Sequence, residues 1–239
     1  MHNDAGAVVL FDLDGTLINT KRLYVECYRR VVLSQIGREL TPEEVLALRP
    51  RSELRFMRDV VGPERVAACM EDFYLAYAEL YDDHFRGIYD GVLGMLEALR
   101  TRPLRLGIVT GKSRRSWELT SAREALGAFD VLVFDDDVAE PKPDPEGLRL
   151  ALERLGAPPE QAVYLGDSVT DMEAATAAGV RPCVALWAKK PADREAFIAR
   201  VEPYGAALFE TPESFARFAL EGVAAGSARA PAGPSSGRA

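Results

Sequence analysis

Histidine, cysteine and lysine are all scarce in this chain of 239 residues. Two histidines, His2 and His84, leave almost nothing from which to build a Ser-His-Asp triad or a histidine-rich metal site. The three cysteines lie far apart without a CxxC spacing, which favours reduced thiols over disulfides or a zinc site. Any catalytic chemistry is therefore expected to depend on carboxylates, hydroxyl groups and lysine.

Basic surface and long apolar runs are also missing. The formal net charge of -8 argues against non-specific affinity for nucleic acid or an anionic membrane, because both require excess positive charge. No apolar run has the length of a membrane span, and the start, MHNDAGAVVL, lacks the basic and apolar segments of a signal peptide. We expect a globular cytoplasmic protein in which any anionic substrate is bound by a local cluster of cations.

Arginine is the usual cation of this chain, since only five of the 29 basic residues are lysine. Clusters of arginine therefore carry little information about function. A lysine at a defined position in a motif carries more.

Short apolar segments that alternate with helical patterns predict a parallel, doubly wound α/β sheet of the Rossmann-like kind. The expected strands lie at residues 7–14, 104–111, 131–137, 162–168 and 181–187, with a short one at 206–210. The expected helices of this part lie at residues 114–127, 144–156 and 212–220.

Residues 21–85 show helical periodicity without a convincing strand, and this segment is too long for a simple crossover. We predict that it is an inserted α-helical cap, and that residues 1–20 and 86–221 form the α/β core. Residues 222–239 are of low complexity and poor in apolar residues other than alanine, so we expect a disordered tail.

Two carboxylates follow the first apolar segment, in VVLFDLDGTL. Asp12 and Asp14 are two apart and would share one face at the end of a strand, where open α/β sheets bind ligands. Two close carboxylates raise each other's pKa unless a cation lies between them. A metal or proton-transfer site explains the pair, and a turn with an aspartate capping the next helix is the structural alternative.

Three other expected strand ends carry polar groups. Thr110 and Gly111 offer a hydroxyl and a backbone N–H for a phosphate oxygen. Lys142 stands between two prolines, while Asp167 and Asp171 are spaced to converge on one cation. Each feature has an ordinary explanation alone, as a turn, a surface lysine or a helix cap. Their joint occurrence, in this order, favours a phosphate and metal site.

The motifs DLDGT, VTG, EPKPDP and GDSVTD resemble those of the haloacid dehalogenase (HAD) superfamily of phosphohydrolases, in particular the phosphoglycolate phosphatase-like members with a helical cap. The resemblance covers about residues 8–220. It implies that Asp12 is a nucleophile that forms an aspartyl-phosphate and that Asp14 is the general acid/base. Thr110 and Lys142 would bind the phosphoryl group.

The same resemblance implies an Mg²⁺ ion as cofactor. Its ligands would be Asp12, the backbone carbonyl of Asp14 and Asp167, with Asp171 supporting the site. The chain departs from many relatives at Asn19, where they carry aspartate, and this position is outside the catalytic set.

The expected reaction is hydrolysis of a small phosphorylated metabolite, and its chemistry agrees with these residues. Cations must first screen the repulsion between a carboxylate nucleophile and a dianionic phosphate, after which Asp14 can protonate the leaving alkoxide and activate water. Gly15 and Thr16 would let the backbone approach the phosphate.

Three further features of the sequence are candidates for contacts that select the substrate. Arg49, Arg51, Arg55 and Arg58 either meet a second anionic group or form a solvated helix face. Lys112, beside the expected phosphate loop, is a better candidate for extra positive charge. Trp187 follows another strand and either lines the entrance or packs.

Three other functions fit parts of the pattern. A phosphosugar mutase uses the same aspartates and returns the phosphoryl group to substrate rather than to water. A non-catalytic phosphate-binding module or a receiver-like phospho-acceptor would not need the complete catalytic set, and receivers lack a cap and a late GDxxxD. The sequence does not identify the substrate or the oligomeric state.

Overall fold

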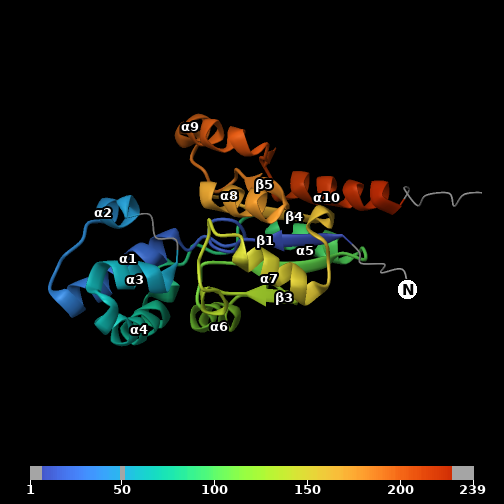
Figure 1. Cartoon of the computed structure of the whole chain (residues 1–239). Coiled ribbons are helices and arrows are strands. Elements are labelled where there is room, and N and C mark those ends of the chain that lie inside the picture. The colour runs from blue at the N-terminus through green and yellow to red at the C-terminus, as the bar shows by residue number, and fades with distance from the viewer. Residues whose placement is uncertain (1–6, 49–51, 228–239) are drawn as a thin grey trace, which may run out of the picture.

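Six parallel strands form one sheet in the described part of the chain, residues 7–48 and 52–227 of this computed structural model (Figure 1). They are β1 (Val8–Phe11), β2 (Arg105–Val109), β3 (Val131–Val133), β4 (Ala162–Gly166), β5 (Arg181–Ala185) and β6 (Ala207–Phe209). Their order is β3-β2-β1-β4-β5-β6, so β1 lies between β2 and β4. The predicted α/β fold is confirmed.

Alternation along β1 sends side chains into two hydrophobic layers. Val9 and Phe11 pack in one layer, and Val8 and Leu10 pack in the other. The first layer contains residues of α5 (Val92–Arg100) and α10 (Pro212–Ser227), and the second contains residues of α7 (Glu146–Leu155) and α8 (Val169–Ala178). Because both faces are covered, the strands are mainly apolar and polar groups are concentrated at the strand ends.

β1 is shorter than the predicted segment 7–14 and ends at Phe11, before both aspartates. A compact turn takes over, in which the backbone N–H groups of Leu17 and Ile18 both donate to the Leu13 carbonyl. The backbone N–H of Asp12 still donates to the Leu165 carbonyl of β4 at 2.8 Å. Asp12 is thus held at the carboxyl edge of the sheet.

The described residues of the segment for which we predicted a cap form four α-helices, and Figure 1 shows these helices gathered beside the sheet. They are α1 (Lys21–Ile36), α2 (Pro42–Ala47), α3 (Glu53–Val61) and α4 (Val66–His84). They bury a hydrophobic cluster of their own, rich in aromatic residues such as Tyr28, Phe73 and Tyr77. The function of this segment as a separate cap domain stays a prediction.

The chain enters and leaves this helical segment at one place. The backbone N–H of Asn19 donates to the Gly87 carbonyl at 2.9 Å, and that of Arg86 donates to the Asn19 carbonyl at 3.1 Å. The two connections therefore lie side by side, next to the turn that follows β1.

The remaining elements differ in part from the sequence patterns. The sequence does not single out α5 or α9 (Pro191–Val201), and α6 (Arg114–Ser121) ends before the predicted boundary at residue 127. After α6 the chain forms a loop, and the Arg100 side chain donates hydrogen bonds to the Leu126 and Ala128 carbonyls of this loop. Short 3₁₀ turns lie at Pro63–Arg65, Asp135–Asp137, Pro159–Gln161 and Glu202–Tyr204.

α10 continues to Ser227, so its last turns extend into the segment that we expected to be disordered from residue 222. The rest of that segment lies outside the described residues. Within residues 7–48 and 52–227, no helix combines the length and the hydrophobicity that a membrane crossing requires.

Candidate active site

The turn after β1 brings two strand ends into contact. Gly15 has a φ of 86°, in the left-handed region that favours glycine. A Cβ atom at Gly15 would lie 2.6 Å from Oδ2 of Asp167, which follows β4. The glycine of DLDGT is therefore required both by the turn and by the close approach of the second aspartate motif.

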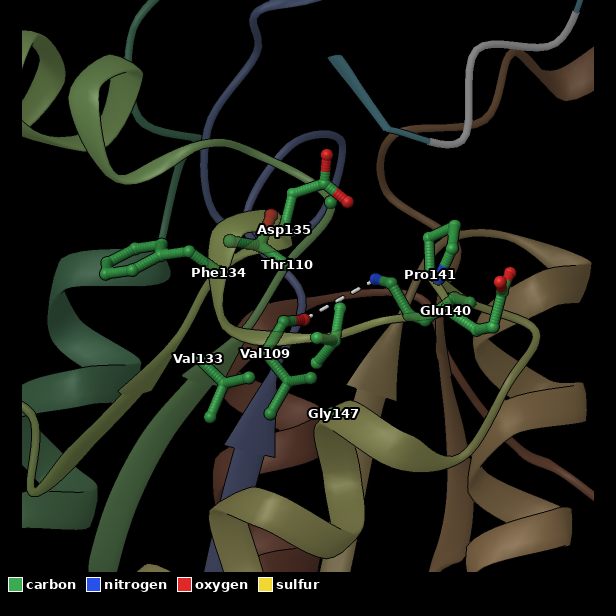
Figure 2. A pocket seen from close by; sticks show the side chains of 11 residues that line it. Val109, Thr110, Val133, Phe134, Asp135, Glu140, Pro141 and Gly147 are labelled. Carbon is green, nitrogen blue, oxygen red and sulfur yellow. Dashed lines mark hydrogen bonds between the residues drawn. The ribbon is translucent and has the colours of Figure 1, made fainter. Parts of the chain in front are cut away.

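Lys142 lies at the centre of the carboxylates. Its ammonium donates to Oδ1 of Asp12 at 2.7 Å, to Oδ1 of Asp171 at 2.7 Å and to the Tyr164 hydroxyl at 2.8 Å. A longer contact of 3.4 Å reaches the Val109 carbonyl at the end of β2, and Figure 2 draws this bond. Four segments distant in sequence thus meet at one ammonium group.

Asp12, Asp167 and Asp171 form a cluster that suits a divalent cation. Each offers a carboxylate oxygen, and these oxygens lie within 4.8 Å of one another. Asp171 is further fixed by Ser168, whose backbone N–H and hydroxyl donate to its Oδ2 at 2.9 and 2.6 Å. Three hard oxygen ligands in one place match the preference of Mg²⁺ or Ca²⁺.

The electrostatics of the cluster also favour a bound cation. Burial raises the pKa of Asp12 to about 8; Lys142 opposes this rise, and Asp171 and Asp167 add to it. Burial also works against the charge of Asp171, but Lys142 and Ser168 hold its pKa below the ordinary value. Lys142 therefore offsets only part of the cost of a buried charge at Asp12, and an additional cation would offset more of it.

Thr110 and the adjoining loops are tightly packed. Thr110 is buried, and the cavity behind it, shown in Figure 2, measures only about 10 Å³. Val109, Val133 and Pro141 are among its lining residues. This space is near the lower limit for one water molecule, so it is not a substrate pocket.

Asp14 does not point to the same partners as Asp12. Its Oδ1 accepts a hydrogen bond from the Thr20 hydroxyl at 2.6 Å and lies 3.4 Å from Nζ of Lys112. Lys112 in turn donates to the hydroxyls of Tyr24 and Tyr77 at 2.6 and 3.0 Å. The two aspartates of DLDGT therefore belong to two different lysine networks.

Comparison with known proteins decides the family. The model of the haloacid dehalogenase-like hydrolases matches residues 9–185, which include both aspartate motifs, Thr110 and Lys142. This chain belongs to that family. The resemblance to the HAD superfamily that the sequence motifs indicated is therefore confirmed. The predicted enzyme class, a phosphoric monoester hydrolase, is confirmed with it.

Individual relatives of this HAD hydrolase include pyrophosphatase PpaX of Bacillus velezensis, which is 35% identical over 195 residues covering 77% of this chain and 85% of the relative. A solved structure from Lactobacillus plantarum, assigned as a phosphoglycolate phosphatase, shares 28% identity with a TM-score of 0.71 and covers 91% of this chain and 99% of its own. CbbY of Rhodobacter sphaeroides in complex with phosphate shares 28% identity with a TM-score of 0.66, over 75% and 86% of the two chains.

Asp12, Lys142, Asp167 and Asp171 of the HAD core motifs lie close together in the structure. The other predicted substrate contacts differ from one another in their surroundings. Arg49 and Arg51 lie outside the described residues. Arg55 donates to the Ala139 carbonyl and pairs with Glu140 at 3.3 Å. It therefore binds the loop that carries Lys142.

Thr16 is fully buried, and its hydroxyl has no hydrogen-bond partner among the described residues. Its carbonyl accepts a hydrogen bond from the Trp187 indole at 2.9 Å. Trp187 therefore packs on the turn after β1. An unpartnered buried hydroxyl beside Asp12 and Asp14 is compatible with the predicted contact to a ligand, which stays a prediction.

Sequence reasoning missed several side chains of this HAD site. Lys189 donates to Oδ2 of Asp167 at 2.6 Å, and Tyr164 contacts Lys142 from the middle of a strand. The scarcity of lysine was a signal that would have singled out Lys189. Nothing in the sequence marked Glu53, which enters the Lys112 network from α3.

Proposed function

We propose that this HAD hydrolase is a cytoplasmic, Mg²⁺-dependent phosphatase that hydrolyses a small phosphorylated metabolite, of the size of phosphoglycolate, through an aspartyl-phosphate on Asp12. The observation that carries the proposal is the placement of Asp12 beside Lys142, with Asp167 and Asp171 completing an acidic cluster at the carboxyl edge of the sheet. A nucleophilic carboxylate, a cation for phosphate and a set of metal ligands are thereby adjacent.

In the first step, an oxygen of Asp12 forms a bond with phosphorus while the bond from phosphorus to the leaving oxygen breaks. Lys142 offsets negative charge at Asp12, and Thr110 with the backbone N–H of Gly111 would hold phosphoryl oxygens. Asp14 gives its proton to the leaving alkoxide. The product of this step is an alcohol and a phosphorylated Asp12.

In the second step, Asp14 takes a proton from a water molecule that attacks the phosphoryl group on Asp12. The bond between the Asp12 oxygen and phosphorus breaks, so phosphate leaves and both carboxylates return to their starting forms. Thr20 orients Asp14 for both transfers through its 2.6 Å hydrogen bond.

Asp12, Asp167 and the backbone carbonyl of Asp14 would hold Mg²⁺, with Asp171 in support. When bound, the ion screens the repulsion between the carboxylate and the phosphate dianion. The buried, mutually repelling carboxylates described above fit such a cation.

Two substrate classes are supported by the comparisons. The solved structure assigned as a phosphoglycolate phosphatase favours a small phosphate monoester, and the PpaX relatives make inorganic pyrophosphate a second candidate. In both cases the leaving oxygen gains charge when its bond to phosphorus breaks. An acid at Asp14 assists either reaction.

The test is a panel of phosphate compounds, including phosphoglycolate, inorganic pyrophosphate and p-nitrophenyl phosphate, assayed for phosphate release with and without Mg²⁺. We expect Mg²⁺-dependent turnover of at least one physiological compound, and no turnover by Asp12→Asn. Release of phosphate at equal rates by the wild type and Asp12→Asn would overturn the proposal.

A phosphosugar mutase is the second candidate function. A solved structure from Thermotoga maritima, assigned as a β-phosphoglucomutase, shares 28% identity with a TM-score of 0.64 over 90% of this chain. Incubation with β-glucose 1-phosphate separates the two, since a mutase yields an isomeric sugar phosphate and a phosphatase yields free phosphate. A non-catalytic phosphate-binding module would yield neither.

A further inference from the structure

Lys112 lies in a second charged network, at the junction between the helices α1–α4 and the sheet. Its side chain is 0% exposed, and its ammonium lies 3.4 Å from Asp14 Oδ1 and 3.8 Å from Glu53 Oε1. The rings of Tyr24 and Tyr77 flank the same ammonium at 4.5 and 4.6 Å, in cation–π geometry. This lysine has no room for direct contact with a substrate.

Glu53 is the member of this network that comes from α3, and it is buried with 2% exposure. Its Oε2 accepts hydrogen bonds from the Ser113 backbone N–H at 3.1 Å, the Ser113 hydroxyl at 2.5 Å and the Ser116 hydroxyl at 2.8 Å. Its Oε1 accepts from the Tyr24 hydroxyl. The carboxylate therefore binds the first turn of α6 and the Lys112 network at once.

Two further contacts dock the first turn of α3 on the core. Asp135, after β3, is near Ser52 and Leu54, which favour its charged form and oppose the rise in its pKa that burial causes. The backbone N–H of Glu53 donates to the Gly111 carbonyl at 3.3 Å. α3 is thereby fixed to the loops after β2 and β3, and Arg55 extends the contact to the loop of Lys142.

The charges explain why Glu53 matters for Asp14. A buried ammonium is held firmly when carboxylates approach it from two sides, because displacement toward either weakens the other contact. Lys112 has Asp14 on the core side and Glu53 on the α3 side. If α3 moved away, Lys112 would keep Asp14 and lose the second carboxylate that fixes its position.

We propose that Glu53 is a positioning residue which, through Lys112, sets the orientation of Asp14, so that the acid/base is correctly placed only when α3 is docked on the core. The inference rests on the proposed phosphatase function, in which Asp14 protonates the leaving group. Docking of the helical segment and proton transfer at Asp14 are thus coupled through one buried ion pair.

The first test uses Glu53→Gln, which keeps the size of the side chain and an acceptor for Ser113 and Ser116 but removes the charge. We expect kcat to fall by about tenfold or more with an alkyl phosphate that needs protonation, and by much less with p-nitrophenyl phosphate. Glu79→Gln, on the exposed face of α4, is the matched control and should behave as the wild type.

A purely structural role for Glu53 gives a different result. Loosened docking alone would raise KM, or lower kcat, by the same factor for both substrates. That equal response would overturn the proposal. Failure of the phosphatase function itself is recognised separately, because the wild type would then release no phosphate or Asp12→Asn would remain active.

The second test is a double-mutant cycle of Glu53→Gln and Lys112→Met. If Glu53 acts through Lys112, the double variant loses no more alkyl phosphate activity than the worse single variant, and independent, multiplying losses contradict the proposal. Thermal unfolding supplies a readout that does not require activity. Lys112→Met should unfold at a lower temperature than the double variant, because it leaves Glu53 buried without its cation.

Discussion

Lys142 and Lys112 each lie between two carboxylates, yet the two lysines join different parts of the molecule. Lys142 contacts Asp12 and Asp171, which follow β1 and β4 of the same sheet. Lys112 contacts Asp14 of the core and Glu53 of α3. The first network consists of residues that follow strands of the sheet, whereas the second also includes Glu53 from α3.

This difference has consequences for how each network responds to change. The carboxylates around Lys142 also form the candidate metal cluster, so a metal ion can supply positive charge there. Among the described residues, no comparable cluster of metal ligands surrounds Lys112. In the part of the chain that the structure describes, the carboxylates paired with Lys112 are those of Asp14 and Glu53.

The largest effect is expected at the nucleophile of the first network. Asp12→Asn should lower turnover by at least about 10⁴-fold with the fold intact, because an amide does not attack phosphorus as a carboxylate does. Phosphate release and the unfolding temperature are measured together, with Asp59→Asn on the surface of α3 as the control. Activity within tenfold of the wild type would end the covalent mechanism.

Asp14→Asn tests the second network by its dependence on the leaving group. The loss should reach about 10² to 10⁴-fold for an alkyl phosphate and be much smaller for p-nitrophenyl phosphate, whose leaving group departs without a proton. Hydrolysis of the phosphorylated Asp12 should be slow in both cases, so a labelled phosphoenzyme should accumulate with p-nitrophenyl phosphate. Single-turnover measurements check both points, and equal slowing of formation without accumulation would assign Asp14 a structural role.

Replacing each lysine in turn should show that Mg²⁺ affects the stability of the two networks differently. Lys142→Met and Lys112→Met each leave buried carboxylates without a cation, which costs about 3–5 kcal/mol of unfolding free energy. Mg²⁺ should restore part of the stability of Lys142→Met and little of that of Lys112→Met. Urea unfolding with Mg²⁺ and with EDTA measures these effects. An equal gain in stability for the two variants would contradict the view that the metal ion binds in the Lys142 network and not in the Lys112 network.

Metal binding by the wild type should give a smaller stabilisation. A ligand at 100 times its Kd adds about 2.7 kcal/mol, which corresponds to a rise in Tm of roughly 5–10 °C for a chain of this size. Asp167→Asn should reduce the rise, and Asp59→Asn should not. In activity assays Ca²⁺ should not replace Mg²⁺, because its larger and looser coordination shell would misplace Asp12. An unchanged Tm on addition of Mg²⁺ would argue against the metal site.

The predictable part of the site follows from local features of the chain. The apolar segments locate β1, β2 and β4, and each is followed by a polar group that the sheet then brings to one edge. Family motifs add roles for Asp12, Asp14, Thr110 and Lys142. The exact end of β1 is not predictable in this way, because the turn after Phe11 must also leave space at Gly15 for Asp167, which is distant in sequence.

By itself, the sequence determined the α/β class, the family and the residues at the strand ends, because apolar periodicity and strand-end motifs are encoded in short segments. Only the tertiary structure decided that Lys189 binds Asp167 and that Lys112 lies between Asp14 and Glu53. Lys112 and its partner Tyr24 are 88 positions apart in the chain. Such pairs form where helices dock on the core, and their geometry depends on packing that no local pattern records.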